Sequence, residues 1–267
     1  MSELLHLKKI LCMGMFFNGA KCDIYIGKGA GKKLLHDIEN ANDSVKIMSP
    51  YLSPNLIKEL INLHSRNIPV QLITTDNIED YKKDQEKIIY KLILQNRESD
   101  YEAILKRNKL NKIKTIFGYL TFALVIAVCG SYAYFIDLRV ALGIIPIILF
   151  FTINRIYKSL VKNKRIYNYW YSQLFPFKVF MSPYQTELSD TFIHGKIYII
   201  DDRIAYLGSM NFTTSAAKYN YETRIRITDP RALKEINDEF HELFNNSNLP
   251  IRDIQFWGKQ LYQEPIN

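Results

Sequence analysis

The sequence is poor in cysteine and has no pattern of residues that is typical of a metal site. Its three cysteines, Cys12, Cys22 and Cys129, are far apart and form neither a CxxC pair nor a Cys/His ligand set. The sequence therefore suggests neither a disulfide framework nor a structural zinc site, and a reducing compartment is the default. Charged residues make up 23% of the chain against 48% hydrophobic residues, a balance that excludes an intrinsically disordered protein.

Acidic residues are almost lacking between residues 106 and 165. This stretch holds 11 lysines and arginines and a single acid, Asp137, so its formal charge is +10. The rest of the chain has 24 bases and 26 acids, a balance of −2. The net charge of +8 therefore comes from one segment, and this distribution favours contact with a membrane surface over a general nucleic-acid-binding face.

Two long uncharged runs lie within this basic stretch. The first, residues 115–136, has 22 residues without a charge, which is enough for a helix to cross a hydrocarbon core of roughly 30 Å. The second, residues 140–153, has 14 residues and contains Pro146, so it spans only if residues 138–139 and 155–157 complete it by snorkelling. The pattern predicts a transmembrane helical hairpin. The alternative is two buried helices of a soluble core, but such helices rarely lack a polar face for about six turns.

The basic residues that flank the two runs indicate which side of a membrane they face. Five lie in residues 106–114 and five in residues 155–165, whereas the intervening turn has only Arg139. By the positive-inside rule, we expect an integral membrane protein with two spans whose attached domain is cytoplasmic. Residues 6–17 superficially resemble a short signal peptide, but no cleavage box follows, and we interpret them as a buried or interfacial segment.

Strand-like and helix-like segments alternate on both sides of the hairpin. Strands are expected at residues 23–26, 45–48, 70–74, 177–180, 192–200 and 222–227, and helices at residues 31–42, 54–65 and 230–245. Neither half has enough strands for a sheet of its own. We therefore expect one α/β domain, a mixed sheet flanked by helices, built from residues 1–105 and 166–267 with the hairpin 106–165 inserted. The charged segments 76–112 and 156–173 have apolar residues near helical spacing and predict a helical stalk.

A glycine-rich segment, Gly27 to Lys33, resembles a phosphate-binding loop. It lacks the four-residue gap before Gly-Lys, and Lys33 stands where Ser or Thr should bind magnesium. The start of a basic helix is the better interpretation of this segment.

The residues most informative about chemistry lie between positions 194 and 211. They follow the pattern HxKx4Dx6GSxN, which begins at His194 and ends at Asn211. Strand alternation places His194 and Lys196 on the same face of an extended segment. The Gly-Ser turn then allows Asn211 to return close to these two side chains. These groups suit a phosphodiester, because Lys196 and Asn211 would bind the non-bridging oxygens while neutral His194 attacks phosphorus and forms a phosphohistidine.

This pattern resembles the HKD motif of the phospholipase D superfamily, and all six identities are present over 18 residues. A turn after a strand, Ser49-Pro50-Tyr51-Leu52, is a looser point of similarity. The resemblance implies a phospholipase D-like α/β fold and a protein similar to single-motif, membrane-anchored members. It also implies a role for each site residue: His194 as nucleophile, Lys196 and Asn211 as phosphate ligands, Ser209 as a donor to the phosphate, Asp201 as a structural support and Glu222 as the acid that orients the histidine.

The chain holds one such motif, whereas the mechanism needs one histidine to attack and a second to protonate the leaving oxygen. None of His6, His36, His64 and His241 stands in an HxK context. We therefore predict a two-fold homodimer in which each protomer contributes one His194 to a composite site. The two imidazoles must start in opposite protonation states, which predicts a bell-shaped pH profile. No cluster of acidic ligands accompanies the motif, so we expect metal-independent turnover without a cofactor.

The motif fits any phosphodiester and therefore leaves the substrate open. Attachment to a bilayer and the basic flanks favour a phospholipid that is hydrolysed or transferred at the cytoplasmic surface. A membrane-anchored nuclease is the alternative, because the resemblance includes anchored members that act on nucleic acid and the basic flanks could guide a strand. A catalytically idle membrane scaffold is a third possibility, against which the intact His194, Lys196 and Asn211 speak.

Overall fold

The computed structural model describes residues 15–76, 91–135, 138–183 and 191–267. These residues form two compact units. We call the first the sheet unit, which comprises Met1–Leu94 and Ser172–Gly258, and the second the hairpin unit, which comprises Gln95–Tyr171 and Lys259–Asn267. The expectations for residues 6–14 lie outside the described residues.

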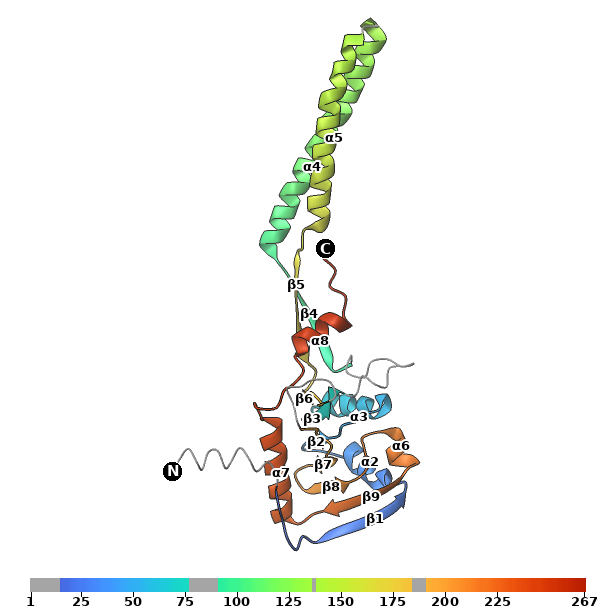
Figure 1. Cartoon of the computed structure of the whole chain (residues 1–267), viewed down its shortest axis with the longest axis vertical. Helices are drawn as coiled ribbons and strands as arrows, with labels where there is room; N and C mark the ends of the chain where they lie inside the picture. The colour runs from blue at the N-terminus through green and yellow to red at the C-terminus, as the bar shows by residue number, and fades with distance from the viewer. Residues whose placement is uncertain (1–14, 77–90, 136–137, 184–190) are drawn as a thin grey trace, which may run out of the picture. The chain divides into compact units, whose positions relative to one another are not determined.

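A seven-stranded mixed sheet forms the centre of the sheet unit (Figure 1). Its strands are β1 (Cys22–Lys28), β2 (Val45–Met48), β3 (Val70–Thr75), β6 (Phe177–Phe180), β7 (Ile197–Ile200), β8 (Ile204–Gly208) and β9 (Tyr221–Ile227), in the order β1-β9-β8-β7-β2-β3-β6. The pairs β2–β3 and β3–β6 are parallel and the others are antiparallel. Strands from before and after the inserted helices share this sheet, and the predicted fold class, a mixed α/β sheet flanked by helices, is confirmed.

Helices cover both faces of the sheet. On one face α7 (Pro230–Phe244) packs its apolar stripe, which includes Ile236 and Phe240, on a core with Ile199 of β7. Asp229 caps this helix by accepting hydrogen bonds from the first turn, where Pro230 is favourable. The other face carries α2 (Gly31–Glu39), α3 (Pro54–Ser65) and the short α6 (Thr214–Lys218), as Figure 1 shows.

Strand β8 was not predicted, and β7 is shorter than expected. The predicted strand 192–200 begins only at Ile197, so His194 and Lys196 lie on the irregular segment that leads into it. A tight turn joins β7 to β8 through Asp201 and Asp202, whose φ angles are +54° and +50°. Glycine and asparagine are the usual residues in this conformation, so an Asp-Asp pair gave no clear turn signal. Helix α8 (Ile254–Leu261) was not predicted either.

Two antiparallel helices dominate the hairpin unit. They are α4 (Tyr101–Phe135) and α5 (Ile144–Asn163), and a short 3₁₀ helix, η3 (Leu138–Gly143), precedes α5. Both are long and apolar enough to cross a membrane, and no residue of their apolar windows is buried. Pro146 lies in the first turn of α5, where its missing N–H breaks no helical hydrogen bond. The second run is thus α-helical from Ile144 on, and the helix extends beyond residue 153 to Asn163.

The predicted helical stalk is wrong at the end farther from the two apolar runs. Instead of helices, residues there form a two-stranded ribbon of β4 (Ile93–Ser99) and β5 (Tyr167–Gln173). Tyrosines alternate along β5, and Arg97 of β4 lies over the ring of Tyr167 at 4.7 Å. Aromatic residues at a period of two, paired across strands, favour a ribbon over a helix. Residues 77–90 of the expected stalk lie outside the described residues.

Candidate active site

Four of the predicted site residues, His194, Lys196, Ser209 and Glu222, gather at one end of the strands of the sheet. His194 and Lys196 precede β7, Ser209 follows β8, and Glu222 is the second residue of β9. Because β7, β8 and β9 are antiparallel neighbours, the start of β7, the end of β8 and the start of β9 lie side by side at the same end of the strands. The geometry therefore brings together residues that the sequence separates by up to 28 positions.

Lys196 lies against the ring of His194. Its Nζ atom is 2.9 Å from Nδ1 and 3.1 Å from Nε2, and it donates a hydrogen bond of 2.7 Å to the His194 carbonyl oxygen. Burial, followed by the positive charge of Lys196, lowers the pKa of His194 below its ordinary value. Burial also lowers the pKa of Lys196, although the charge of Glu222 opposes this shift. The arrangement favours a neutral imidazole, which is the form that acts as a nucleophile.

The contact between Lys196 and His194 predicts how the pKa of His194 changes when the charge of Lys196 is removed. In Lys196→Met the pKa of His194 is expected to rise, because removal of the neighbouring positive charge makes protonation easier, while burial still keeps it below its ordinary value. NMR titration of protein labelled at histidine in detergent measures the shift. Lys234→Met, on the exposed face of α7, is the control and should leave the titration of His194 unchanged. A lower pKa in Lys196→Met would contradict the inferred electrostatics.

Ser209 and Glu222 form a hydrogen-bonded pair beside Lys196. The Ser209 hydroxyl donates to the Glu222 carboxylate and accepts from the backbone N–H of Thr223 at 3.0 Å. Asn220 donates a second hydrogen bond of 3.2 Å to Glu222. Within the residues that the structure describes, Glu222 thus hydrogen-bonds Ser209 and Asn220 and makes no hydrogen bond to His194. Its influence on the pKa of Lys196 nevertheless places its charge within the site.

Asn211 has a side-chain amide oxygen without a partner in the described part of the chain. Its Oδ1 atom is buried and has no hydrogen-bond partner among the described residues. A buried amide without a partner costs free energy, so this one fits a group that hydrogen-bonds a ligand. Rotation of the amide lets Nδ2 donate to a phosphate oxygen.

Two residues that sequence reasoning did not place in the site hold the chain around Asn211. The hydroxyl of Ser49 accepts a hydrogen bond of 2.9 Å from the backbone N–H of Phe212 and donates one of 2.8 Å to the Tyr51 carbonyl. The buried hydroxyl of Tyr198 donates to the carbonyl of Met210 at 2.6 Å. The Ser49-Pro50-Tyr51 turn was the only signal in the sequence that could have identified Ser49.

Asp201 lies at the end of β7 that is farther from Lys196, outside the cluster formed by His194, Lys196, Ser209 and Glu222. Its carboxylate accepts hydrogen bonds from the backbone N–H groups of Asn42, Asp43 and Ser44, the shortest being 2.7 Å from Asp43. These bonds fasten the β7–β8 turn to the segment that leads into β2. The geometry therefore gives Asp201 contacts that stabilise the fold and none with the other motif residues.

The substitution Asp201→Ala is accordingly expected to lower the stability of the fold and to leave the catalytic rate unchanged. The free energy of unfolding should fall by about 2 kcal/mol, because three backbone N–H groups lose a charged acceptor. Thermal unfolding in detergent measures this loss, and turnover per folded molecule at low temperature should be unchanged. Asp43→Ala, which removes only an exposed ion pair with Arg203, is the matched control and should change stability by less than about 0.5 kcal/mol. Loss of turnover in folded Asp201→Ala would contradict a purely structural role.

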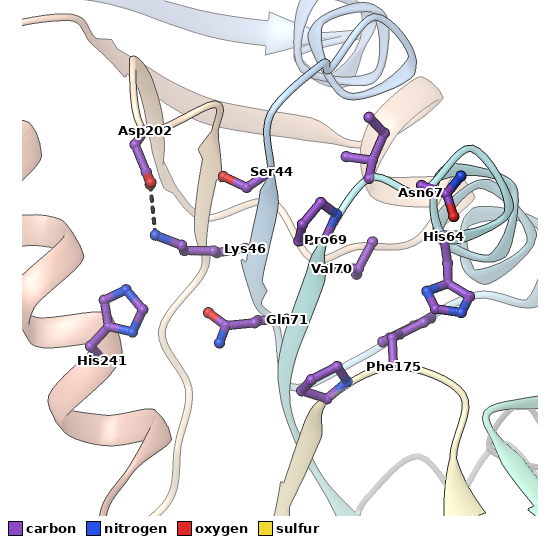
Figure 2. Close-up of a pocket in the computed structure, with 12 residues that line it drawn as sticks. Ser44, Lys46, His64, Asn67, Pro69, Val70, Gln71, Phe175, Asp202 and His241 are labelled. Atoms are coloured by element: carbon purple, nitrogen blue, oxygen red, sulfur yellow. Dashed lines mark hydrogen bonds and ion pairs between the residues drawn. The ribbon is translucent and has the colours of Figure 1, made fainter.

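A separate cavity of about 510 Å³ lies in the sheet unit where β2 and β3 begin. Figure 2 shows Lys46 of β2 in its wall, ion-paired with Asp202 at 2.6 Å, and the rings of His64 and His241. None of the predicted site residues lines this cavity. The cavity lies at the opposite end of the strands from His194, because β2 and β7 are antiparallel and Met48 at the end of β2 pairs with Ile197 at the start of β7.

Metal ligands do not accompany the site in the described part of the chain. No group of three or more His, Cys, Asp or Glu residues there could hold a metal ion. The metal-independent turnover expected from the sequence remains a prediction.

Comparison with protein families identifies the chain. Residues 34–132 and 147–244 match a family model described as "Cardiolipin synthase, PLD-like domain". The match covers more than half of the chain and includes every predicted site residue from His194 to Glu222. The chain belongs to the phospholipase D superfamily. The predicted family and fold are thus confirmed, and because superfamily members are phosphodiesterases, membership supports an enzyme of this kind.

Solved structures resemble this phospholipase D-like chain at low identity. NucT from Helicobacter pylori is 13% identical, with 88% of this chain and 100% of that chain covered and a TM-score of 0.44. Nuc from Salmonella typhimurium, a phospholipase D family member, is 13% identical over 87% and 99% of the two chains, with a TM-score of 0.40. Phosphatidylserine synthase from Haemophilus influenzae Rd KW20 is 14% identical over 89% of this chain and 41% of that chain, with a TM-score of 0.41. No curated protein matches the chain.

Proposed function

We propose that this protein is a membrane-anchored phosphodiesterase that cleaves or transfers a phospholipid phosphodiester through a phosphohistidine intermediate. The observation that carries the proposal is the contact of His194 with Lys196 at 2.9 Å, which combines a neutral imidazole with a fixed positive charge. Asn211, whose amide Oδ1 has no partner among the described residues, and Ser209 lie on the segment that follows β8. This set can hold a phosphate and attack it.

The proposed reaction has two displacements at phosphorus. In the first, a ring nitrogen of His194 forms a bond to phosphorus, and the bond from phosphorus to the leaving alcohol oxygen breaks. An imidazolium donates its proton to that oxygen. In the second, the resulting imidazole takes a proton from water or from an acceptor alcohol, whose oxygen attacks phosphorus and releases His194. Lys196 and Asn211 stabilise the negative charge on the non-bridging oxygens in both steps.

A second copy of the chain is proposed to supply the imidazolium. Of the other histidines that the structure describes, His36 lies on α2, whereas His64 and His241 line the cavity at the opposite edge of the sheet. His64 and His241 are therefore at the other end of the strands from a group bound at His194, and Nδ1 of His36 lies 3.5 Å from the Asp37 carboxylate. The composite site of a two-fold homodimer, with one His194 from each protomer, provides both catalytic groups.

Mixing experiments test this homodimer. A dimer with one His194→Ala protomer has no intact site, so activity should fall with the square of the unmodified fraction. Co-expression of equal amounts of both chains is then expected to leave about one quarter of the activity, whereas independent protomers would retain about one half. A linear dependence on the unmodified fraction would contradict the composite site.

The helices α4 and α5 support attachment to a bilayer. Their apolar windows are unburied, so the apolar side chains need a cover that a membrane supplies. Residues 101–114 of α4 carry the basic flank and extend for about 21 Å at the rise of an α-helix. In a membrane these lysines and arginines would lie beside anionic headgroups on the cytoplasmic side. A lipid phosphodiester is therefore the substrate that the protein would meet at the highest local concentration.

The decisive assay offers several phosphodiesters to the same preparation. Detergent-solubilised full-length protein is incubated, with EDTA present, with labelled phosphatidylglycerol, cardiolipin and single-stranded DNA, and His194→Ala serves as the control. We expect lipid turnover that is lost in the variant. Cleavage of DNA alone would identify a nuclease and overturn the lipid substrate. Equal rates for both chains on every substrate would overturn phosphodiesterase activity and favour a scaffold.

A further inference from the structure

Exposed aromatic and basic side chains lie in the sheet unit beside the site, where the edge strand β1 ends and its neighbour β9 begins. Tyr219 and Tyr221 are 69% and 72% exposed, and Ile26 is 59% exposed. Exposed lysines accompany them at the end of β1, in α2 and in α6. We call this surface the tyrosine–lysine rim and define it as Ile26, Lys28, Lys32, Lys218, Tyr219 and Tyr221.

Backbone pairing makes the rim continuous with the site. In the β1–β9 ladder Lys28 lies opposite Tyr221, and the preceding residue Gly27 lies opposite Glu222. Glu222 in turn hydrogen-bonds Ser209. A ligand held at His194 and Ser209 would therefore lie next to the rim.

Close packing of α2 on α6 brings the remaining lysines together. A Cβ atom on Gly31 would lie only 2.5 Å from the Cα atom of Ala217, so the two backbones are in direct contact. Lys32 and Lys218 are the next residues along these two helices. The rim thus lies where β1 ends and β9 begins: Ile26, Lys28 and Tyr221 share the sheet face that carries α7, and Lys32 and Lys218 lie on the helices of the other face.

The exposed charge of the rim is entirely positive. Among the described residues no carboxylate lies within ion-pair distance of Lys28, Lys32 or Lys218, whereas the neighbouring Lys33 is paired with Asp37 at 2.9 Å. Glu222, the acid nearest to the rim along β9, is 9% exposed and already hydrogen-bonded. An anionic surface would therefore be attracted to the rim.

We propose that the tyrosine–lysine rim docks the sheet unit on an anionic bilayer surface and so presents lipid headgroups to His194. Tyrosine rings are suited to the boundary between headgroups and acyl chains, and lysines to the lipid phosphates. The exposed aliphatic chain of Ile26 favours a bilayer over single-stranded nucleic acid, whose bases need aromatic planes for stacking. This inference rests on the proposed lipid function, since docking serves an enzyme whose substrate is in the membrane.

A fluorescence experiment tests the docking without requiring turnover. Full-length Tyr221→Trp is reconstituted in phosphatidylglycerol liposomes that contain lipids brominated near the headgroup, which quench tryptophan on contact. Glu235→Trp, on the exposed face of α7, is the matched control, and the signal of Trp170 and Trp257 is subtracted from both. We expect quenching of the Tyr221→Trp reporter to be at least threefold greater than that of the control.

Charge variants of the reporter protein test the role of the lysines. Lys28→Gln/Lys32→Gln/Lys218→Gln should lose at least half of the quenching. Arg203→Gln/Arg231→Gln/Lys234→Gln, which removes three exposed positive charges elsewhere in the sheet unit, should retain it.

Four other outcomes would overturn the docking proposal. These are equal quenching at both reporter positions, loss of quenching in both charge variants, a response to single-stranded DNA instead of brominated lipid, and a response that depends on protein concentration alone, which would identify a second copy of the chain on the rim. The outcome is distinguishable from failure of the proposed function. Reporter quenching without lipid turnover would retain the docking and reject the lipid phosphodiesterase, whereas turnover without quenching would do the reverse.

Discussion

Replacement of His194 by alanine is expected to lower phosphodiesterase turnover by about 10⁴-fold. In the proposed composite site each His194 has a role, one as nucleophile and one as acid, and proton transfer by a positioned residue alone contributes about 10²–10⁴-fold. Lys196 and Asn211 remain in the variant, so substrate binding should change far less than kcat. Steady-state kinetics with the substrate found in the parallel assay measure both quantities.

A matched histidine variant separates the chemistry from the fold. His64→Ala changes a histidine in the wall of the separate cavity and should leave turnover within a few-fold of the unmodified protein. Thermal unfolding of both variants establishes that they are folded. Turnover that survives in folded His194→Ala, or an equal loss in folded His64→Ala, would refute the assignment of His194 as nucleophile.

Replacement of Gly208 by alanine is expected to be the most destabilising single change in the motif. A Cβ atom at this position would lie 2.0 Å from the Thr223 carbonyl oxygen, and the φ angle of Gly208 is +155°. The obstacle is backbone of the neighbouring strand and cannot move aside alone. The free energy of unfolding should fall by about 3 kcal/mol, which corresponds to a decrease in Tm of about 6–12 °C for a domain of this size.

The same variant should also lose activity. Displacement of the Thr223 carbonyl breaks the 3.1 Å hydrogen bond from the Ser209 N–H and disturbs the contact of Ser209 with Glu222. Gly195→Ala is the control for stability, because its Cβ atom would meet only the flexible end of the Met48 side chain, at a cost below about 1 kcal/mol. An unfolding midpoint of Gly208→Ala equal to that of the unmodified protein would contradict the tight approach of β8 to β9.

The sequence predicted the segments whose signals are local. The pattern from His194 to Asn211 identified the superfamily, since these spacings reflect one continuous stretch around the β7–β8 hairpin. The apolar stripe and the capping residues of the helix at residues 230–245 predicted α7, which ends at Phe244. The two uncharged runs predicted α4 and α5, because an unbroken apolar stretch needs no knowledge of its neighbours.

The segments that sequence reasoning missed depend on partners distant in the chain. Strand β8 has only five residues and follows an Asp-Asp turn, so its strand character comes from β7 and β9 on either side. Residues 167–173 have charged neighbours and some apolar residues near helical spacing, yet they pair with β4 to form a ribbon. The periodicity of a short sequence window cannot reveal this pairing, because β4 lies more than 60 residues away.

By itself, the sequence determined the phospholipase D superfamily, the mixed α/β class, the apolar helix pair and the identity of the motif residues. Only the tertiary structure decided what each motif residue contacts. Lys196 contacts the ring of His194, and Glu222 accepts a hydrogen bond from Ser209. The Oδ1 atom of Asn211 has no partner among the described residues, and Asp201 bonds a backbone segment at the other end of β7. The physical reason is that a motif fixes positions along one chain, whereas hydrogen bonds and pKa shifts arise between strands and loops that approach only after folding.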